Sequence, residues 1–387
     1  MSFQPLAGVR VVDVTTSLAG PYCTEILAAL GADVVKVEPP EGDHARAWGP
    51  PFAAGGQGVL FLAANAGKRS LALSLADARG REALIRLADR ADVFVQSLRP
   101  GLAEEKGLGP NALRARNPAL VYCTIGAFGR RGPLRDEPGY DPLMQAAAGI
   151  VSLTGEPQGP GVRVGTSLVD LGTGVWAALA IVAALHDGGG RAIDLSLYET
   201  AVALVGYQLT GYLATGTVPG REGTAFPLIA PYQVFSTADG ELMIAAANDG
   251  LWRRLRETLN LPDEERFRTN PQRVRNREEL VAAISARLRT ASSAEWLERL
   301  RTAGVPVAPV QDIRQVAEAE QTAALGLLQD LGAYVAPGLP LSVDDERPPH
   351  SSPAPEVGAH TADVLAEAGY SQDEIAALAD AGVVRAG

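Results

Sequence analysis

The stretch VRVVDVTTSLAGPYCTEILAALGADVVKVE, residues 9–38, decides the fold of this chain. Residues 9–14 are rich in β-branched side chains, residues 21–30 suit a helix, and residues 32–37 form a second apolar run that ends at Glu38. A strand, a helix and a second strand in this order predict half of a doubly wound sheet. The first turn, TTSLAGP, has one glycine where the dinucleotide fingerprint GxGxxG needs three, so an NAD site is not indicated.

The alternation of strand and helix continues along the chain. Asp77 is placed to cap a helix, and three glycines at 188–190 break the chain before a further strand. Alternating strands and helices imply a parallel sheet with right-handed crossovers. The predicted segments are strands at 93–95, 119–124 and 192–195, a helix with Leu84, Leu87, Ala88 and Ala91 on one face, and helices at 141–150 and 172–185.

A smaller α+β unit is expected after residue 205. It contains a strand over 242–247 and amphipathic helices around 251–259, 277–289 and 294–303. Six prolines between 337 and 355 mark an extended connection before a final helix over 361–368. We therefore divide the chain into the first part of a large domain (1–205), a linker with a small domain (206–325), and a return linker with the last part of the large domain (326–387).

The composition excludes several classes of protein. The chain has 387 residues, 47% hydrophobic and 20% charged, as in an ordinary globular protein. Its formal charge of −11, without a Lys/Arg run, argues against nucleic acid as a partner. The longest apolar run, residues 175–185, is short of the roughly 20 residues that cross a bilayer, and the first residues lack a signal-peptide pattern. We expect a cytoplasmic protein with no membrane partner.

The cysteines and histidines give no sign of a disulfide or a metal site. Cys23 and Cys123 stand far apart and outside any CxxC motif, which favours free thiols. The four histidines show no metal-ligand spacing, so no metal is expected.

Asp170 is the only charged side chain in VGTSLVDLGTGVW, residues 164–176. By residue type alone, an acid in this context is more often a helix cap or a turn residue than a nucleophile. The other interpretation is a site that uses the charge. With a reference pKa of about 3.9 an aspartate is ionised at pH 7 and needs no base to attack a carbonyl, and a thiolate, with a pKa of about 8.5, is a suitable leaving group. Thioesters therefore fit better than amides.

A thioester of coenzyme A would also need cations for its phosphates. Five cations lie in or beside turns that follow predicted strands, where open α/β sheets bind ligands. Each by itself is more often a solvated surface residue, so their grouping is the informative feature. They are Lys36, Arg46, Lys68, Arg69 and Arg99.

Seven segments in order give the chain a resemblance to the class III CoA-transferases, the family of formyl-CoA:oxalate and carnitine CoA-transferases that also contains 2-methylacyl-CoA racemases. The segments are PLAGVRVVDVTTSLAGPYCTEILAALGADVVKVEPPEGD (5–43), NAGKRSLALSL (65–75), LRPG (98–101), GYDPLMQAAAG (139–149), GTSLVDLGTG (165–174), GVPVAPV (304–310) and GAHTADVLAEAGYS (358–371).

The resemblance implies a nucleophilic aspartate at Asp170. Its carboxylate would attack an acyl-CoA to give a mixed anhydride, CoA would return to give an aspartyl-CoA thioester, and an acceptor acid would take the CoA. Asp141 matches an acidic position close to the nucleophile. Tyr140 stands where racemases carry histidine, and a phenol is a poor base at neutral pH, so transfer is favoured over racemisation.

The resemblance also implies which residues of the large domain hold CoA, the substrate, with no tightly bound cofactor. Two positions depart from the family pattern. Pro39 stands where several transferases place arginine, and Glu105 stands where a basic residue often follows the turn, which leaves Lys106 as a substitute. The implied contacts are Ser17, Leu18, Ala19, Pro39, Arg46, Lys68, Arg69, Leu71, Leu73, Ser97, Arg99 and Lys106.

The acceptor acid and the assembly are less defined. Residues 220–231, GREGTAFPLIAP, lack the glycine run of the oxalate-using enzymes, and Arg163 or Arg221 is a candidate for recognising a second carboxylate. The family's fold is a dimer of interlocked chains, so a homodimer is expected. Two alternatives remain open: a 2-methylacyl-CoA racemase and a non-catalytic CoA-binding protein.

Overall fold

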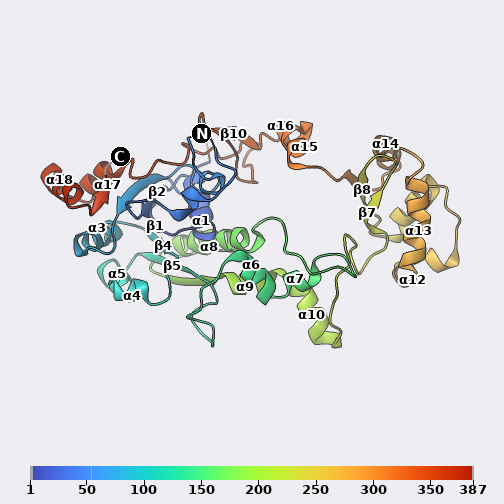
Figure 1. Ribbon diagram of the computed structural model, residues 1–387, viewed down its shortest axis with the longest axis horizontal. Coiled ribbons are helices and arrows are strands. Elements are labelled where there is room, and N and C mark those ends of the chain that lie inside the picture. The colour runs from blue at the N-terminus through green and yellow to red at the C-terminus, as the bar shows by residue number, and fades with distance from the viewer. Residues whose placement is uncertain (1–2, 54, 386–387) are drawn as a thin grey trace. The chain divides into compact units, whose positions relative to one another are not determined.

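The computed structural model describes residues 3–53 and 55–385, and the chain forms two compact units (Figure 1). The sheet unit comprises residues 1–150, 164–210 and 320–387, and the small unit comprises residues 151–163 and 211–319. Three separate segments therefore build the sheet unit.

A seven-stranded sheet forms the centre of the sheet unit, with strand order β12-β3-β2-β1-β4-β5-β6. All neighbouring strands run parallel except β12, which pairs antiparallel with β3 at one edge. The predicted parallel-dominated α/β fold is confirmed, although β3 and β12 were absent from the strands predicted by pattern. The strands are β1 (Arg10–Val14), β2 (Asp33–Glu38), β3 (Arg69–Leu73), β4 (Val93–Gln96), β5 (Val121–Gly126), β6 (Ala192–Ser196) and β12 (Val384–Arg385).

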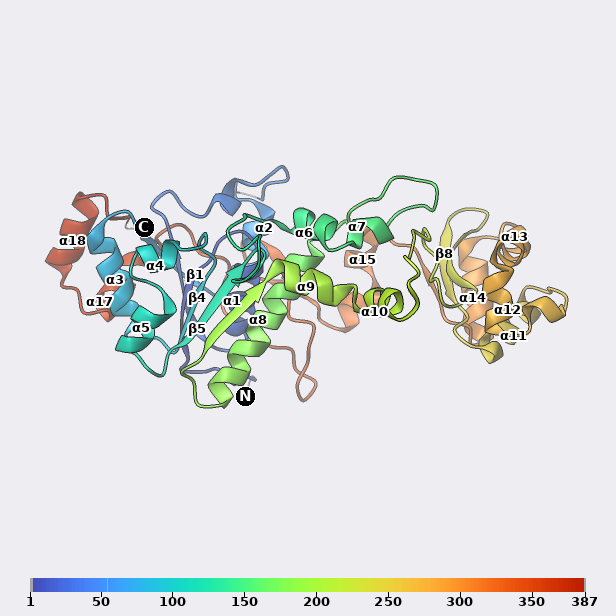
Figure 2. The same ribbon diagram turned by 90° about the horizontal axis from the view of Figure 1, so that it is seen from below.

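Helices cover both faces of this sheet, which explains why its strands are apolar on both sides. Figure 2 shows α3, α5, α17 and α18 on the side of the strands opposite α8. One face packs against α1 (Ala19–Ala29) and α8 (Leu168–His186). The other packs against α3 (Ala78–Ala88), α5 (Pro110–Arg116), α17 (Thr361–Glu367) and α18 (Gln372–Asp380).

The strand order reverses between β1 and β4, because β2 and β3 lie on one side of β1 and β4 to β6 lie on the other. In open α/β sheets, ligands bind at the carboxyl ends of the strands at such a switch point. The loops that follow β1 and β4 are joined here, since the N–H of Thr16 donates to the hydroxyl of Ser97 across 3.1 Å.

Helix α8 begins four residues earlier than the predicted start at residue 172. Asp170 therefore lies in the first turn of the helix, and its interpretation as a cap or turn residue is wrong. With 19 residues and a mean hydropathy of 2.0 over its most apolar window, α8 is long and apolar enough to cross a bilayer, unlike the run read from sequence. Its buried residues nevertheless belong to the core beneath the sheet, as in a core helix of a folded domain.

The predicted helix over 141–150 is interrupted. Gly149, with φ of 88°, separates α6 (Asp141–Ala147) from α7 (Ile150–Leu153). Glycine adopts this left-handed conformation without steric cost, so the chain turns there. The remaining elements within or next to the sheet unit are η1 (His44–Ala47), α2 (Val59–Leu62), α4 (Leu102–Glu105), α9 (Leu197–Leu204), α10 (Gly206–Thr215), α16 (Glu320–Ala324), β10 (Leu328–Asp330) and β11 (Val335–Pro337).

The small unit is an α+β structure with an antiparallel sheet in the order β7-β8-β9. The three predicted amphipathic helices are present as α11, α13 and α14, and they bury Trp252, Ile284 and Trp296 against the sheet. Its elements are β7 (Tyr232–Ser236), β8 (Glu241–Ala245), α11 (Asp249–Thr258), η2 (Glu265–Phe267), α12 (Asn270–Arg275), α13 (Arg277–Leu288), α14 (Ser293–Thr302), β9 (Val307–Pro309) and α15 (Ile313–Glu318).

Candidate active site

Asp141 holds the beginning of α8. One carboxylate oxygen accepts the backbone N–H groups of Val169 at 2.7 Å and Asp170 at 3.2 Å. The first N–H groups of a helix have no partner within the helix, and a negative charge there also interacts favourably with the helix dipole. A residue 29 positions away in sequence therefore caps α8 and fixes the backbone of Asp170.

Gln145 completes this arrangement and was not recognised from sequence. Its side-chain N–H donates to the other carboxylate oxygen of Asp141 at 2.6 Å, and its carbonyl accepts the N–H of Val164 at 2.8 Å. Asp141 and Gln145 are both buried and stand one helical turn apart in α6. That four-residue spacing in GYDPLMQ was the available signal, but only the fold shows what the pair contacts.

The carboxyl group of Asp170 is largely removed from water. Burial, and then the charge of Asp141, raise the pKa of Asp170 to about 7. The expectation that Asp170 is fully ionised at pH 7 is therefore wrong, because about half of such carboxyl groups carry a proton at that pH. A carboxylate with a higher pKa is also a stronger nucleophile than an ordinary aspartate, so the same surroundings that suppress ionisation favour attack by the ionised form.

Close packing brings the first turn of α1 against the second turn of α8. A Cβ atom at Gly174 would lie 2.8 Å from the carbonyl oxygen of Ala19 and 3.0 Å from the ring of Tyr22, so glycine is required here. Asp170 is one helical turn before Gly174. The beginning of α8 thus lies next to the loop between β1 and α1, where the first CoA contacts were predicted.

Tyr140 adjoins Asp141 but has a different environment. It precedes α6 in an extended conformation, and its side chain is 55% exposed. Its carbonyl accepts the N–H groups of Leu143 and Met144, which anchors the start of the helix. Of the three predicted catalytic residues, Asp141 and Asp170 are joined directly, and Tyr140 is the exposed neighbour of that pair.

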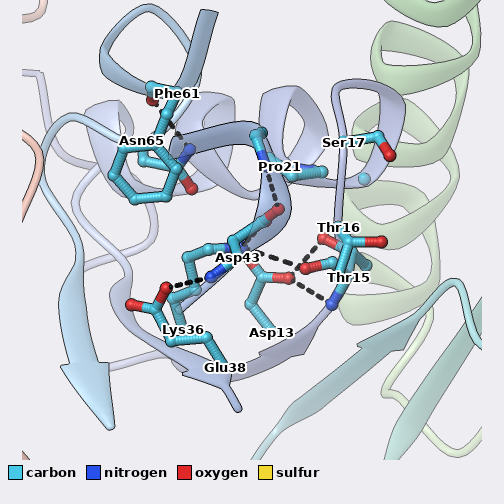
Figure 3. Close-up of polar contacts among 12 residues, drawn as sticks. Asp13, Thr15, Thr16, Ser17, Pro21, Lys36, Glu38, Asp43, Phe61 and Asn65 are labelled. Carbon is cyan, nitrogen blue, oxygen red and sulfur yellow. Dashed lines mark hydrogen bonds and ion pairs between the residues drawn. The ribbon is translucent and has the colours of Figure 1, made fainter. Parts of the chain in front are cut away.

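A buried ionic cluster lies beneath the loop between β1 and α1 (Figure 3). Asp13 is its centre, and Lys68 donates to Asp13 at 3.1 Å, to the carbonyl of Pro21 at 2.8 Å and to Asn65 at 2.9 Å. Burial alone would raise the pKa of Asp13, but Lys68 and Lys36, with hydrogen bonds from threonine hydroxyls, lower it to about 2. Asp13 is therefore a permanent buried anion that its cations must balance.

Most of the predicted phosphate-binding cations are engaged in ion pairs. Lys36 and Lys68 have fully buried side chains, and Lys36 pairs with Asp43 at 2.9 Å. Arg46 makes two hydrogen bonds to Glu38, and Arg69 pairs with Asp33 and Glu367. In this structure these four side chains stabilise the sheet unit and do not extend into solvent as free cations.

Two predicted cations remain at the surface after β4. The side chain of Arg99 is 75% exposed and lies 3.9 Å from Glu105, which also pairs with Lys106 at 2.9 Å. Glu105 therefore compensates both cations. An incoming anion would compete with this carboxylate for Arg99 and Lys106.

The other predicted CoA contacts fall into two groups. Ser17, Pro39 and Ser97 are partly exposed in the loops at the carboxyl ends of β1, β2 and β4. Leu18 is buried, and Ala19, Leu71 and Leu73 are buried in the two cores that flank the sheet. Among the described residues, no group of three His, Cys, Asp or Glu side chains is arranged to hold a metal, and Cys23 and Cys123 are buried free thiols.

The family model of CoA-transferase family III matches residues 6–361, nearly the whole chain. The chain belongs to this family. It is 39% identical over 382 residues to a succinate–glutarate CoA-transferase of Agrobacterium fabrum, covering 94% of this chain and 95% of that one. An acetyl-CoA:oxalate CoA-transferase of Acetobacter aceti is 37% identical over 358 residues, covering 90% and 92%. This protein is accordingly an enzyme that transfers CoA between an acyl-CoA and a carboxylic acid.

The fold agrees with a solved member of the same group. A CAIB/BAIF family protein from Brucella suis superposes with a TM-score of 0.86 and 36% sequence identity, covering 95% of this CoA-transferase and all of that chain. The resemblance inferred from seven sequence segments is thereby confirmed at the level of family and of fold.

Proposed function

We propose that Asp170 carries the acyl group and then CoA through two covalent intermediates. Its carboxylate attacks the thioester carbonyl of the donor, and the C–S bond breaks to give an acyl-aspartyl anhydride and CoA thiolate. The thiolate attacks the aspartyl carbonyl and releases the donor acid, leaving an aspartyl-CoA thioester. The acceptor carboxylate attacks this thioester, and CoA thiolate leaves as an anhydride forms between the acceptor acid and Asp170. The thiolate then attacks the acceptor's carbonyl carbon in this anhydride, which yields the new acyl-CoA and free Asp170.

The position of Asp170 in the first turn of α8 supports this role. Its backbone is held by Asp141, it lies one helical turn before Gly174, which packs against the start of α1, and its pKa of about 7 leaves a substantial ionised fraction at neutral pH. The attacking groups in these steps are carboxylates and CoA thiolate, which are already anions, so no step requires a separate base.

We propose dicarboxylic acids as the substrate class. The names of the relatives from A. fabrum and A. aceti specify succinate, glutarate and oxalate, which are all dicarboxylates.

We propose that CoA binds at the carboxyl ends of β1, β2 and β4, with Arg99 and Lys106 contacting phosphate. Both pair with the exposed Glu105, whereas Lys68 and Arg46 are engaged in buried ion pairs. Ser17, Pro39 and Ser97 provide the partly exposed loop surface.

We further propose a cytoplasmic homodimer with interlocked chains. The outer face of α8 exposes Val175, Trp176 and Leu179, whose exposed fractions are 49%, 52% and 55%. A row of three large apolar side chains on one helix is typical of a surface that another chain covers.

Trapping the anhydride tests the nucleophile. The enzyme is incubated with succinyl-CoA and then with hydroxylamine, which converts an activated carboxyl to a hydroxamate, and its peptides are examined by mass spectrometry. A hydroxamate on Asp170 is the expected result. Modification elsewhere, or none with any donor that supports turnover, would contradict the assignment.

Proton removal next to a thioester is a second candidate activity, because a carboxylate with a pKa near 7 is also a suitable general base. Incorporation of deuterium at the α-carbon of a 2-methylacyl-CoA in D₂O would reveal it. We expect little exchange, since Tyr140 occupies the position of the second proton carrier.

A further inference from the structure

Ser17 and His44 form a hydrogen-bonded pair that the transfer mechanism does not use. The hydroxyl oxygen of Ser17 lies 3.1 Å from Nε2 of His44. Both residues are at the carboxyl end of the sheet, since Ser17 follows β1 and His44 begins η1 after β2. Serine hydroxyl and imidazole at this distance are the nucleophile and general base of many acyl-transfer enzymes.

The third group of such a constellation lies behind the imidazole. Nδ1 of His44 is 3.6 Å from Oδ1 of Asp43, and the other oxygen of Asp43 pairs with the buried Lys36 at 2.9 Å. His44 has a 48% exposed side chain, and its ring packs against Trp48 with a centroid distance of 5.0 Å. Oδ1 of Asp43 also accepts the backbone N–H of Ala45 at 2.9 Å, which fixes this carboxylate beside the imidazole. Catalytic contacts that are long in the free enzyme often tighten when substrate binds.

The backbone at Ser17 is strained. Its φ of 70° lies in the left-handed region, which non-glycine residues rarely adopt, and such strain is often retained at functional sites. Ser17 also lies in the turn between β1 and α1, and a strained serine in a strand-turn-helix segment is the arrangement that exposes the nucleophile in α/β hydrolases. Figure 3 shows Ser17 at the far end of the loop from the Asp13 cluster.

The start of α1 offers donors for an oxyanion. Leu18, the N-cap residue, makes no side-chain hydrogen bond to the first turn, and Ala19 and Gly20 follow it. Backbone N–H groups at a helix N-terminus stabilise the negative charge that develops on a carbonyl oxygen during acyl transfer. The residue after the nucleophile supplies one such donor in the strand-turn-helix arrangement.

We propose that Ser17, His44 and Asp43 constitute a second catalytic site, which hydrolyses acyl-CoA thioesters. The Ser17 oxygen bonds to the thioester carbon while its proton passes to Nε2 of His44, and the C–S bond breaks as that proton goes to sulfur. Water then attacks the acyl-serine with His44 as base, which releases the acid and restores Ser17. The net reaction consumes one acyl-CoA and one water and yields one acid and one CoA thiol.

This inference relies on acyl-CoA binding at the first loop, as proposed above, but it does not require Asp170. Release of CoA thiol from succinyl-CoA is therefore measured without an acceptor acid in Asp170→Ala, whose aspartyl intermediates cannot form. His44→Gln is added in that background, and His186→Gln, at the far end of α8, is the matched control. Transfer to an acceptor is measured separately with the unaltered enzyme and Asp170→Ala, so failure of the proposed nucleophile is detected independently.

We expect Asp170→Ala to release thiol, and the added His44→Gln change to slow that release at least tenfold while His186→Gln has no effect. A fluorophosphonate probe should also label Ser17 in the unaltered enzyme, and the label should be lost in Ser17→Ala. Absence of thiol release in a folded Asp170→Ala enzyme together with absence of a label on Ser17, or release that His44→Gln does not slow, would overturn the proposal.

Discussion

The backbone N–H of Asp170 donates to the carboxylate of Asp141 across 3.2 Å, so the proposed nucleophile and the charge that raises its pKa are directly connected. The same carboxylate holds the first turn of α8 in place. Structure and reactivity at this site therefore both depend on the buried carboxylate of Asp141.

Replacing the nucleophile should abolish transfer without unfolding the protein. Asp170→Asn keeps the size of the side chain and removes the attacking oxygen anion, so kcat should fall by about 10⁴-fold or more, as for other covalent nucleophiles. The melting temperature should not fall, because among the described residues the carboxylate of Asp170 has no favourable ion pair that would offset its burial. Initial rates with succinyl-CoA and glutarate, alongside thermal unfolding, provide the measurement.

Neutralising Asp141 should change the pH dependence of catalysis. In the unaltered enzyme the pKa of about 7 predicts that kcat/KM falls as pH drops below 7, because Asp170 becomes protonated. Asp141→Asn removes the neighbouring charge and lowers the pKa of Asp170, so the fall should begin at a lower pH. We also expect a loss of about 1 kcal/mol in the free energy of unfolding, since the helix loses its charged cap. If kcat/KM falls at the same pH in both enzymes, the charge of Asp141 does not affect the pKa of Asp170.

Lys68 should behave as a structural residue. Lys68→Met leaves the Asp13 carboxylate buried without its nearest cation, and breaking a buried ion pair costs about 3–5 kcal/mol.

Arg99→Met removes an exposed side chain and should leave the free energy of unfolding unchanged, but it should raise the KM for acyl-CoA about tenfold if Arg99 contacts phosphate. Urea unfolding and initial rates of both variants distinguish these roles.

Glu25 should make the protein less stable at alkaline pH. It is buried in α1 with its carboxylate 3.7 Å from His350, and burial raises its pKa to about 8 although Lys68 opposes the shift. The folded state then binds a proton more tightly than the unfolded state, so the contribution of Glu25 is greatest below pH 4.5 and is lost as pH rises through about 8.

Glu25→Gln removes this titration. When the pH rises from 5 to 8, the unaltered enzyme should lose up to about 4 kcal/mol of free energy of unfolding that the variant does not lose. Urea unfolding at the two pH values checks this difference. An equal difference between the two proteins at both pH values would show that Glu25 does not titrate in this range.

Hydrophobic patterning was sufficient to predict β1, α1, β2 and the parallel sheet, because these segments bury both faces of their strands and one face of each helix. It was insufficient for the start of α8. The cap of that helix comes from Asp141, in a different segment, and no local signal within 164–176 reveals it. β12 was also missed, since two residues form that strand only because β3 offers an unpaired edge.

The sequence predicted which residues form the candidate site, but it did not predict the protonation state of Asp170. Sequence located Asp170 and Asp141, but burial, and then the charge of Asp141, raise the pKa of Asp170, and both depend on the fold. Lys68 was predicted to contact phosphate because it follows a turn. In the structure Lys68 is buried and pairs with Asp13, 55 residues earlier, and no spacing rule connects the two positions.

The pairing of β12 with β3 has a consequence for synthesis of the chain. Val384 lies opposite Leu73, so the last strand of the sheet leaves the ribosome more than 300 residues after its partner. Until then β3 is an unprotected edge on a nascent chain, available to any other extended segment. We therefore expect this edge to need protection from wrong pairing during translation, for example by a chaperone that binds exposed strands.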